Sequence, residues 1–430
     1  MKKLLLGIFI LLGSLVGKAQ DTITFMQYNL LNYGNFTSYC TSSNNNVARK
    51  TGYVAEIVHY VKPDILSVNE ITGTRTYHDY LLNNGLNSDG VDYYAKAPSL
   101  SPDDAYLVNM LYYNKEKLGL AAHTIAQTYV RDVDVYKLYY KSSTLNQGDT
   151  TFIFCVVAHL KAGSDPEGSY TNQNKRKIMA ENTMNYIATH DPDENYLLMG
   201  DFNLYTDQEP AFQEFIHYKT ASVRFYDPVN QIGDWHNNSQ YALYHTQSTH
   251  SYSSGCPSGG GLDDRFDFIL ISNNVKQGNK KVKYVPGSFH VVGQDGKHFN
   301  KALLDDPQNT TVPSNVLNAL YQNSDHLPVT LKVTVNQPTG IRQQHSDIEQ
   351  LKFNNPVKDI LNFEVNVSRP FTLQVKVFSL VGKQVLQKKI VLQKGSSRHN
   401  MNIARLPGGL YILQFSEPNG YSFSRKLLKY

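Results

Sequence analysis

The chain has 430 residues, of which 41% are hydrophobic and 18% are charged, so it is long and apolar enough for two domains with ordinary cores. The formal net charge of +4 is unevenly distributed: residues 21–336 hold 24 Lys and Arg against 32 Asp and Glu, a net −8, whereas residues 337–430 hold 14 against 5, a net +9. The acidic balance of the larger part excludes a general electrostatic attraction for polyanions over its surface.

Residues 1–19 have the pattern of a secretory signal peptide. Two lysines are followed by an apolar run from Leu4 to Val16, and small residues stand at the −3 and −1 positions before Gln20. That run is too short for a membrane span, which takes about 20 residues, and no later stretch is long and apolar enough. We therefore expect cleavage before Gln20 and an exported protein without a transmembrane segment. The alternative is an uncleaved anchor.

Apolar runs and helical spacings alternate between residues 20 and 336. Valines and an isoleucine at positions 54, 57, 58 and 61 predict a helix that ends at Lys62-Pro63, and a second helix is expected over Asn174–His190. Residues 205–265 and 286–322 are polar and are expected to form loops that shape a cleft. The expected strands cover Thr22–Phe25, Asp64–Asn69, Phe152–Ala158, Tyr196–Met199 and Arg265–Leu270.

Polar residues of catalytic type lie on or beside the ends of these strands, in a fixed order. Each one alone is weak evidence, since a carboxylate in a turn after a buried strand is common. Among them Glu70 is the best single metal ligand, because a carboxylate that ends a buried strand needs compensation. The complete set is Asn29, Glu70, His159, Asp201 and Asn203, Asp267, and Asp325 with His326.

This ordered set resembles the endonuclease/exonuclease/phosphatase superfamily, which includes pancreatic-type deoxyribonuclease, exonuclease III, bacterial sphingomyelinase and the inositol polyphosphate 5-phosphatases. The resemblance covers about residues 21–336. It implies an α/β fold, a four-layer α/β sandwich of two packed β-sheets flanked by helices. It also implies hydrolysis of a phosphate ester, with a divalent cation opposing the charge that builds on the phosphate.

The resemblance also assigns roles to the set. His326 is expected to be the general base and Asp267 to orient it. Asp201 and Asn203 are expected to bind the attacked phosphate, with His159 facing it from the other side. The expected metal ligands are Asn29, Glu70 and Asp325, whose oxygen atoms suit Mg²⁺, with Mn²⁺ or Ca²⁺ as substitutes.

Two motifs favour some branches of that superfamily over others. His159 stands where apurinic-site repair nucleases have a tyrosine, and no arginine follows Asp267, which disfavours the inositol phosphatases. We expect a secreted phosphodiester hydrolase, an extracellular endonuclease of broad sequence tolerance, monomeric and acting on nucleic acid. The alternatives left open are a phosphatase or sphingomyelinase-like phospholipid phosphodiesterase, and a non-catalytic surface binding protein on a degenerate scaffold.

The C-terminal part has the pattern of a separate small domain. Residues 337–350 are polar and are expected to form a linker, and residues 351–430 show short alternating strands typical of a β-sandwich. Asn355–Asp359, Leu406–Tyr411 and Lys426–Lys429 resemble motifs of the type A C-terminal sorting domain of the type IX secretion system. That resemblance implies export through the periplasm and outer membrane, with release or attachment at the cell surface. A carbohydrate-binding sandwich is the alternative.

The three cysteines fit an oxidising compartment. Cys155 lies in an apolar strand and is expected to be a buried thiol. Cys40 and Cys256 lie in loops rich in Ser, Asn and Gly, where a disulfide would supply the constraint that a core does not. We expect these two to be linked; the alternative is two unpaired thiols.

Overall fold

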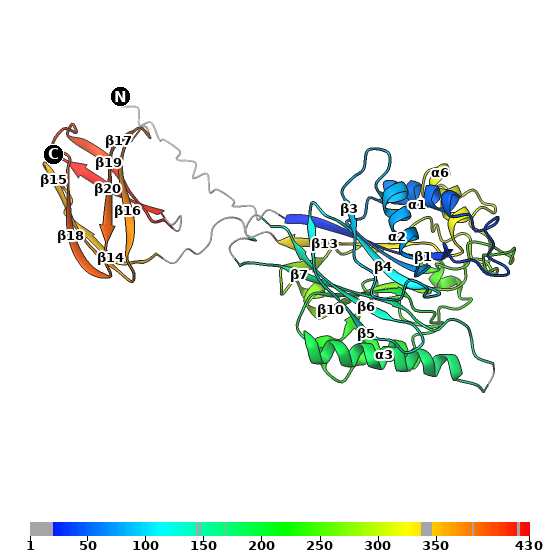
Figure 1. Cartoon of the computed structure of the whole chain (residues 1–430). Coiled ribbons are helices and arrows are strands. Elements are labelled where there is room, and N and C mark those ends of the chain that lie inside the picture. The colour runs from blue at the N-terminus through cyan, green and yellow to red at the C-terminus, as the bar shows by residue number, and fades with distance from the viewer. Residues whose placement is uncertain are drawn as a thin grey trace, which may run out of the picture. The chain divides into compact units, whose positions relative to one another are not determined.

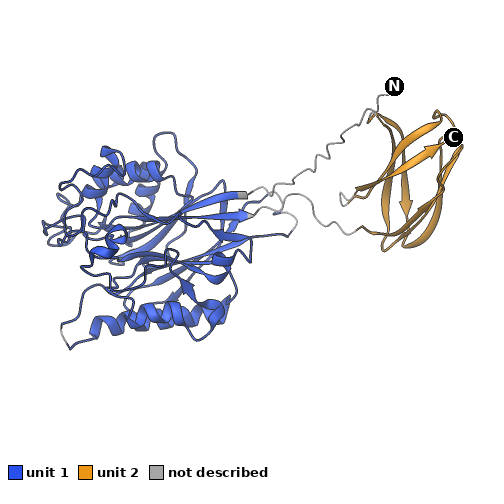
Figure 2. Ribbon diagram, turned by 180° about the vertical axis from the view of Figure 1, so that it is seen from behind, with its two compact units in different colours: residues 1–337 blue, residues 338–430 orange. Residues whose placement is uncertain are grey.

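The computed structural model describes residues 20–336 and 346–430, apart from residues 143, 144, 146, 147, 167, 381 and 419–421. The expected signal peptide, residues 1–19, and most of the expected linker, residues 337–345, lie outside the described residues. The chain divides into two compact units between Gln337 and Pro338 (Figure 2). In the part of the chain described here, every helix is too short or too polar to cross a membrane.

Two β-sheets form the centre of the first unit. The first sheet has the strand order β11-β13-β1-β2-β4-β3, with β12 beside β13, and the second has the order β5-β6-β7-β8-β10-β9. The strands are β1 (Gln20–Tyr33), β2 (Ile65–Ile71), β3 (Tyr94–Lys96), β4 (Val108–Asn114), β5 (Leu118–Gln127), β6 (Val133–Tyr140), β7 (Phe152–His159), β8 (Tyr196–Asp201), β9 (Phe225–Tyr226), β10 (Asp267–Ser272), β11 (Val282–Tyr284), β12 (His290–Val291) and β13 (Val329–Asn336).

Helices cover the outer faces of this pair of sheets. Helices α1 and α6 lie together on the side of the first sheet, and α3 lies along the second (Figure 1). Two helical layers, α1 with α6 on one side and α3 on the other, enclose the two sheets and give the four-layer α/β sandwich that was expected. The α-helices are α1 (Val47–Val61), α2 (Arg75–Leu81), α3 (Thr171–His190), α4 (Pro210–His217), α5 (Asn273–Gln277) and α6 (Ser314–Asn323).

Both faces of the central strands are buried, which explains their unbroken apolar runs. On β7, Cys155 and Val157 belong to the core between the sheets, whereas Val156 belongs to the core under α3. The neighbouring β8 divides in the same way, with Met199 in the first core and Leu198 in the second. Cys155 is a buried free thiol, as predicted.

Some element boundaries differ from the expectations. Strand β1 continues past Phe25 to Tyr33, so Asn29 lies inside the strand and not after it. Helix α1 begins at Val47 because the side chain of Asn46 accepts a hydrogen bond from the backbone N–H of Arg49 and caps it. The segments 205–265 and 286–322, expected as loops, contain the helices α4 and α6.

Cys40 and Cys256 form a disulfide, which confirms the predicted pairing. The bond joins two positions 216 residues apart in sequence. With Leu31, the two cysteines form a small separate apolar cluster. The disulfide therefore ties the segment between β1 and α1 to the segment before β10.

The second unit consists of two antiparallel sheets around one core, as expected for a β-sandwich. One sheet has the order β14-β15-β18 and the other β17-β16-β19-β20. Buried and exposed side chains alternate along β15 and β19. Strand β14 begins inside the segment that was expected to be linker. The strands are β14 (Ile348–Phe353), β15 (Ile360–Val367), β16 (Phe371–Ser379), β17 (Gln384–Leu392), β18 (Gly395–Asn402), β19 (Gly409–Ser416) and β20 (Ser422–Lys429).

Candidate active site

The register of the central strands places the sequence-predicted polar residues together. Strands β7 and β8 are parallel, with His159 opposite Asp201, and β10 runs antiparallel to β8, with Asp267 opposite the same residue. In the first sheet, β1 and β2 are parallel, and Asn29 lies opposite the residue before Glu70. The Nδ2 of Asn29 donates to Oδ2 of Asp201 at 3.0 Å, so the two sheet edges meet at the site.

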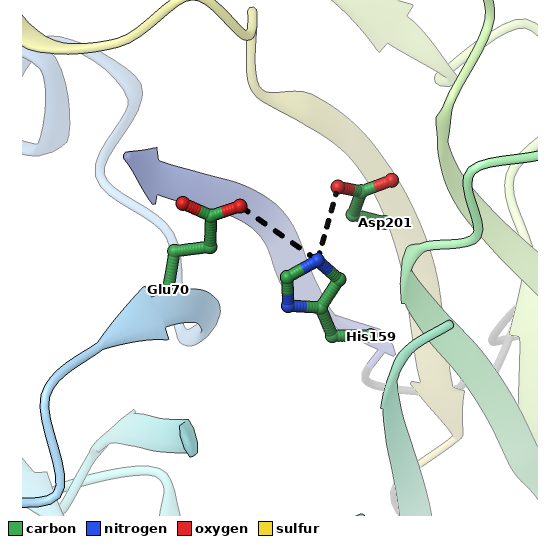
Figure 3. Close-up of side chains that lie close together, drawn as sticks. All are labelled: Glu70, His159 and Asp201. Carbon is green, nitrogen blue, oxygen red and sulfur yellow. Dashed lines mark ion pairs between the residues drawn. The ribbon is translucent and has the colours of Figure 1, made fainter. Parts of the chain in front are cut away.

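Glu70, His159 and Asp201 form a compact cluster of possible metal ligands, each offering a ligand atom within 4.8 Å of the others. Nε2 of His159 lies 3.7 Å from Oε1 of Glu70 and 3.5 Å from Oδ2 of Asp201. Figure 3 shows the ring directed at both carboxylates. The Nδ2 of Asn29 also donates to Glu70 Oε1, at 3.2 Å. Its Oδ1 accepts from the N–H of Leu31, so the amide nitrogen of Asn29 faces the two carboxylates, and its role as an oxygen ligand stays a prediction.

The backbone around these residues is constrained. Glu70 and Asn203 have positive φ values of 57° and 52°. This backbone conformation is costly for residues other than glycine and often marks functional positions. A Cβ on Gly200 would lie 1.7 Å from the carbonyl oxygen of Ala158, so only glycine fits before Asp201. The N–H and Nδ2 of Asn203 donate to Asp201 Oδ1 at 3.0 and 2.9 Å. These contacts fix the carboxylate of Asp201.

His326 and Asp267 form a buried dyad. Nδ1 of His326 lies 2.7 Å from Oδ2 of Asp267, and its Nε2 lies 3.8 Å from Oδ2 of Asp201. Nε2 also lies 2.8 Å from Nε2 of Gln247. A neutral imidazole that donates to Asp267 through Nδ1 carries its lone pair on Nε2, where the amide N–H of Gln247 is the hydrogen-bond donor. That is the tautomer a general base requires.

Asp325 lies beside the dyad and outside the three-residue cluster. Its Oδ2 accepts from the backbone N–H of Ser258 at 2.9 Å, and Nε2 of Gln247 lies 3.4 Å from the same oxygen. Its Oδ1 is buried and has no hydrogen-bond partner among the described residues. Asp325, which was expected to be a metal ligand, therefore has one oxygen held by hydrogen bonds and one oxygen, Oδ1, that could bind a cation.

Burial and charge perturb this site strongly. Burial raises the pKa of Asp201 to about 7 and lowers the pKa of His159 well below its usual value. Burial also acts to lower the pKa of His326, but the negative charges of Asp267 and Asp201 outweigh it and raise that pKa well above its usual value. The buried carboxyl of Asp201 therefore takes up a proton more readily than a free aspartate does.

The residues at this edge fit a divalent cation. Two carboxylates and an imidazole converge, and Nε2 of His159 and Oδ1 of Asp325 are buried without hydrogen-bond partners among the described residues. A buried carboxylate such as Asp201 is stabilised in its charged form by an added positive charge. Glu70 belongs both to the expected ligand set and to the observed cluster, so it is the strongest ligand candidate.

Several site residues were not found from the sequence. Gln247 bonds to the dyad, but it lies in a polar segment without a strand pattern. Oδ1 of Asn69 accepts from the N–H of Asp201 at 2.9 Å, and this bond links the two sheets behind the site. Nδ2 of Asn69 donates to Asn109 of the same sheet at 2.7 Å. The position of Asn69 in an apolar strand, directly before Glu70, was the only available signal.

Comparison with known families matches two parts of the chain. Residues 26–300 match the model of the Endonuclease/Exonuclease/phosphatase family, and residues 353–430 match that of the secretion system C-terminal sorting domain. No curated protein matches the chain in sequence. Together the fold and the matched families define an exported hydrolase of phosphate esters. The chain belongs to the Endonuclease/Exonuclease/phosphatase family and ends in a secretion system C-terminal sorting domain.

Solved structures of similar fold share little sequence with the chain. TDP2 of D. rerio, complexed with a single-stranded DNA product, is 14% identical over 73% of this chain and 98% of its own, with a TM-score of 0.44. A family protein of Bacteroides vulgatus is 13% identical over 73% and 99%, with a TM-score of 0.45. The mannosyl-6-phosphatase of Bacteroides thetaiotaomicron is 14% identical over 72% and 99%, with a TM-score of 0.43.

Proposed function

We propose that this protein is a secreted, Mg²⁺-dependent phosphodiester hydrolase that cleaves extracellular nucleic acid as an endonuclease of broad sequence tolerance. The observation that carries the proposal is the convergence of the His326–Asp267 dyad with the cluster of Glu70, His159 and Asp201. A base, two carboxylates and a second imidazole around one point are the groups that in-line attack of water on a phosphate requires.

Each residue has a distinct task in this mechanism. His326 accepts a proton from the attacking water, while Asp267 holds the ring in the required tautomer and stabilises the imidazolium. Asp201, held by Asn203, orients the water, and His159 donates an N–H to a phosphate oxygen. When bound, the divalent cation opposes the negative charge that develops on the phosphate oxygens. Glu70 would be its main ligand.

A cavity beside His159 supports a diester substrate. It measures about 280 Å³, and its walls include Tyr106, Val130, Arg131 and His159. Nη1 of Arg131 donates to the carbonyl of Leu160 at 2.6 Å. Burial lowers the pKa of Arg131, whereas Glu70 and Asp201 act to raise it. A guanidinium next to the phosphate position suits the neighbouring phosphate of a polynucleotide, which a phosphomonoester lacks.

The test is a substrate comparison with the purified full-length protein and Mg²⁺. Supercoiled plasmid DNA should be nicked and then linearised, bis-p-nitrophenyl phosphate should be hydrolysed, and EDTA should abolish both activities. Arg131→Gln should raise KM for DNA more than KM for the small diester. Rapid turnover of sugar phosphates, inositol phosphates or sphingomyelin, with no cleavage of DNA or RNA, would replace the nuclease proposal with one of the other phosphoesterase activities.

A further inference from the structure

Lys50 is a buried lysine on α1, outside the residues that carry the proposed chemistry. It is only 4% exposed. Its Nζ donates to two backbone carbonyls, that of Leu31 at 2.9 Å and that of Asn323 at 2.5 Å. A buried ammonium is costly and is found where hydrogen bonds or opposite charges compensate it. Leucine or methionine would fill the same space without this cost, so the position of the charge calls for an explanation.

The two carbonyls belong to the segments that carry the site residues. The N–H of Leu31 donates to Oδ1 of Asn29 at 2.9 Å. The second carbonyl belongs to the residue directly before Ser324, whose hydroxyl donates to the carbonyl of Asn29 at 2.8 Å and accepts from the N–H of His326 at 3.1 Å. The ammonium thus completes a set of hydrogen bonds that joins the segment of Asn29 to the segment of His326.

Both carbonyls lie where the backbone has left its regular pairing. Leu31 and Asn32 have positive φ values of 47° and 54°, and the register between β1 and β2 shifts there. Asn323 is the last residue of α6, and the carbonyls at a helix C-terminus lack partners within the helix. A cation is also favoured at that end by the helix dipole. Nζ of Lys50 therefore supplies a hydrogen bond to a carbonyl in each of these two irregular segments.

The charge of Lys50 acts on the site as well. Burial lowers the pKa of Lys50 to about 7, whereas the negative charges of Asp325 and Glu70 act to raise it. These two carboxylates were expected as metal ligands from the sequence. The ammonium therefore lies within electrostatic range of the same groups whose segments it ties together.

We propose that Lys50 is a positioning residue of the active site: it fixes the segment of Asn29 relative to the segment of Asp325 and His326. The kinetic part of this inference rests on the proposed phosphodiesterase function. The structural part, the placement of His326, does not.

The test compares Lys50→Met and Lys50→Arg with Val54→Ala in the full-length oxidised protein. Val54 is a fully buried residue of the same helix, and its apolar side chain cannot donate to either carbonyl, so its truncation reports the cost of a loosened α1 alone. With bis-p-nitrophenyl phosphate and saturating Mg²⁺, Lys50→Met should lower kcat by about 10–100-fold with KM changed less than about threefold. Lys50→Arg should recover most of kcat, because the 290 Å³ cavity lined by Lys50 leaves room for the larger head group.

A second readout needs no turnover. The imidazole NMR signals of His326 in metal-free protein should shift or broaden in Lys50→Met and stay unchanged in Val54→Ala. If Lys50→Met does not fold, Lys50→Gln, which keeps one donor, should show a smaller change in the same direction. A kcat and a His326 signal in Lys50→Met that match Val54→Ala would overturn the proposal, as would no recovery with arginine. If the wild type hydrolyses no phosphodiester, the proposed function fails and the NMR comparison still decides the role of Lys50.

Discussion

The two ring nitrogens of His326 face different partners, and this asymmetry determines what the residue can do. Nδ1 lies 2.7 Å from Asp267, whereas Nε2 lies 3.8 Å from Asp201 in the carboxylate cluster. A proton on Nδ1 is held by the aspartate, so Nε2 is the nitrogen that can take a proton from water. Asp267 is fully buried, which keeps its charge directed at the ring.

Substitution of either member of the dyad should therefore reduce turnover. His326→Ala should lower kcat by about 10²–10⁴-fold, the usual contribution of a general base. Asp267→Asn should also be damaging, because an amide does not stabilise the imidazolium. The double variant should be little worse than His326→Ala, since the two residues act as one unit. His290→Ala, at an exposed histidine on β12, is the matched control and should keep full activity. Additive losses in the double variant would separate Asp267 from His326.

At the scale of single residues, the sequence predicted positions better than contacts. Glu70, His159 and Asp201 could be found because each one lies at or next to the end of an apolar strand, and strand register then pairs His159 with Asp201. The donor role of Asn29 could not be predicted, because it depends on a hydrogen bond to a residue 172 positions away. The same holds for Lys50, because the predicted helical spacing begins only at Val54 and a local pattern does not show that a charge is buried.

Among the elements, the segment between β1 and α1 is cross-linked to the segment before β10 by the Cys40–Cys256 disulfide. A cross-link between residues 216 positions apart restricts the unfolded chain strongly. The double variant Cys40→Ser, Cys256→Ser should lose about 2–4 kcal/mol of unfolding free energy, measured by urea denaturation. Wild-type protein in dithiothreitol should match the variant, and the variant itself should be insensitive to dithiothreitol. Three free thiols in the oxidised, denatured wild type, instead of the one expected at Cys155, would contradict this prediction.

A second long connection, between β9 and β10, is fixed by a buried ion pair. Nη1 and Nη2 of Arg265 donate to the two carboxylate oxygens of Asp227 at 3.0 and 2.8 Å, and both side chains are 1% exposed. Asp227→Ala leaves the guanidinium buried without its partner and should lower the unfolding free energy by about 3–5 kcal/mol. Glu181→Ala, which breaks the surface pair with Lys177, should change it by about 0–0.5 kcal/mol. Equal effects of the two variants would show that water reaches Arg265.

The elements most clearly predicted from the sequence were those with a strong period. Helices α1 and α3 and the central strands follow from apolar spacing, and the β-sandwich follows from strict alternation. Helices α4 and α6 were missed because polar residues surround them and neither has a capping side chain at its start. Tertiary packing of α4 against α3 and of α6 against α1, which a local pattern does not report, stabilises them.

At the scale of the whole molecule, charge divides the chain at the same place as structure does. The segment 21–336 carries a net −8 and the segment 337–430 a net +9, and the compact units separate at residues 337 and 338. All of the proposed catalytic residues lie in the first unit, and the sorting-domain match, residues 353–430, lies in the second. Each unit also has its own hydrophobic core. Export and catalysis should therefore be separable.

Deletion of residues 346–430 should leave an active enzyme that remains in the periplasm. The reason is that no residue of the proposed site lies beyond His326, and β13, the last strand of the first unit, ends at Asn336. Cell fractionation and hydrolysis of bis-p-nitrophenyl phosphate measure the two properties separately, and kcat should stay within about twofold of the full-length value. His326→Ala in the full-length chain is the reciprocal control, since it should be exported normally and be inactive. A truncated protein that folds, as judged by circular dichroism, but has lost activity would assign the second unit a part in substrate binding.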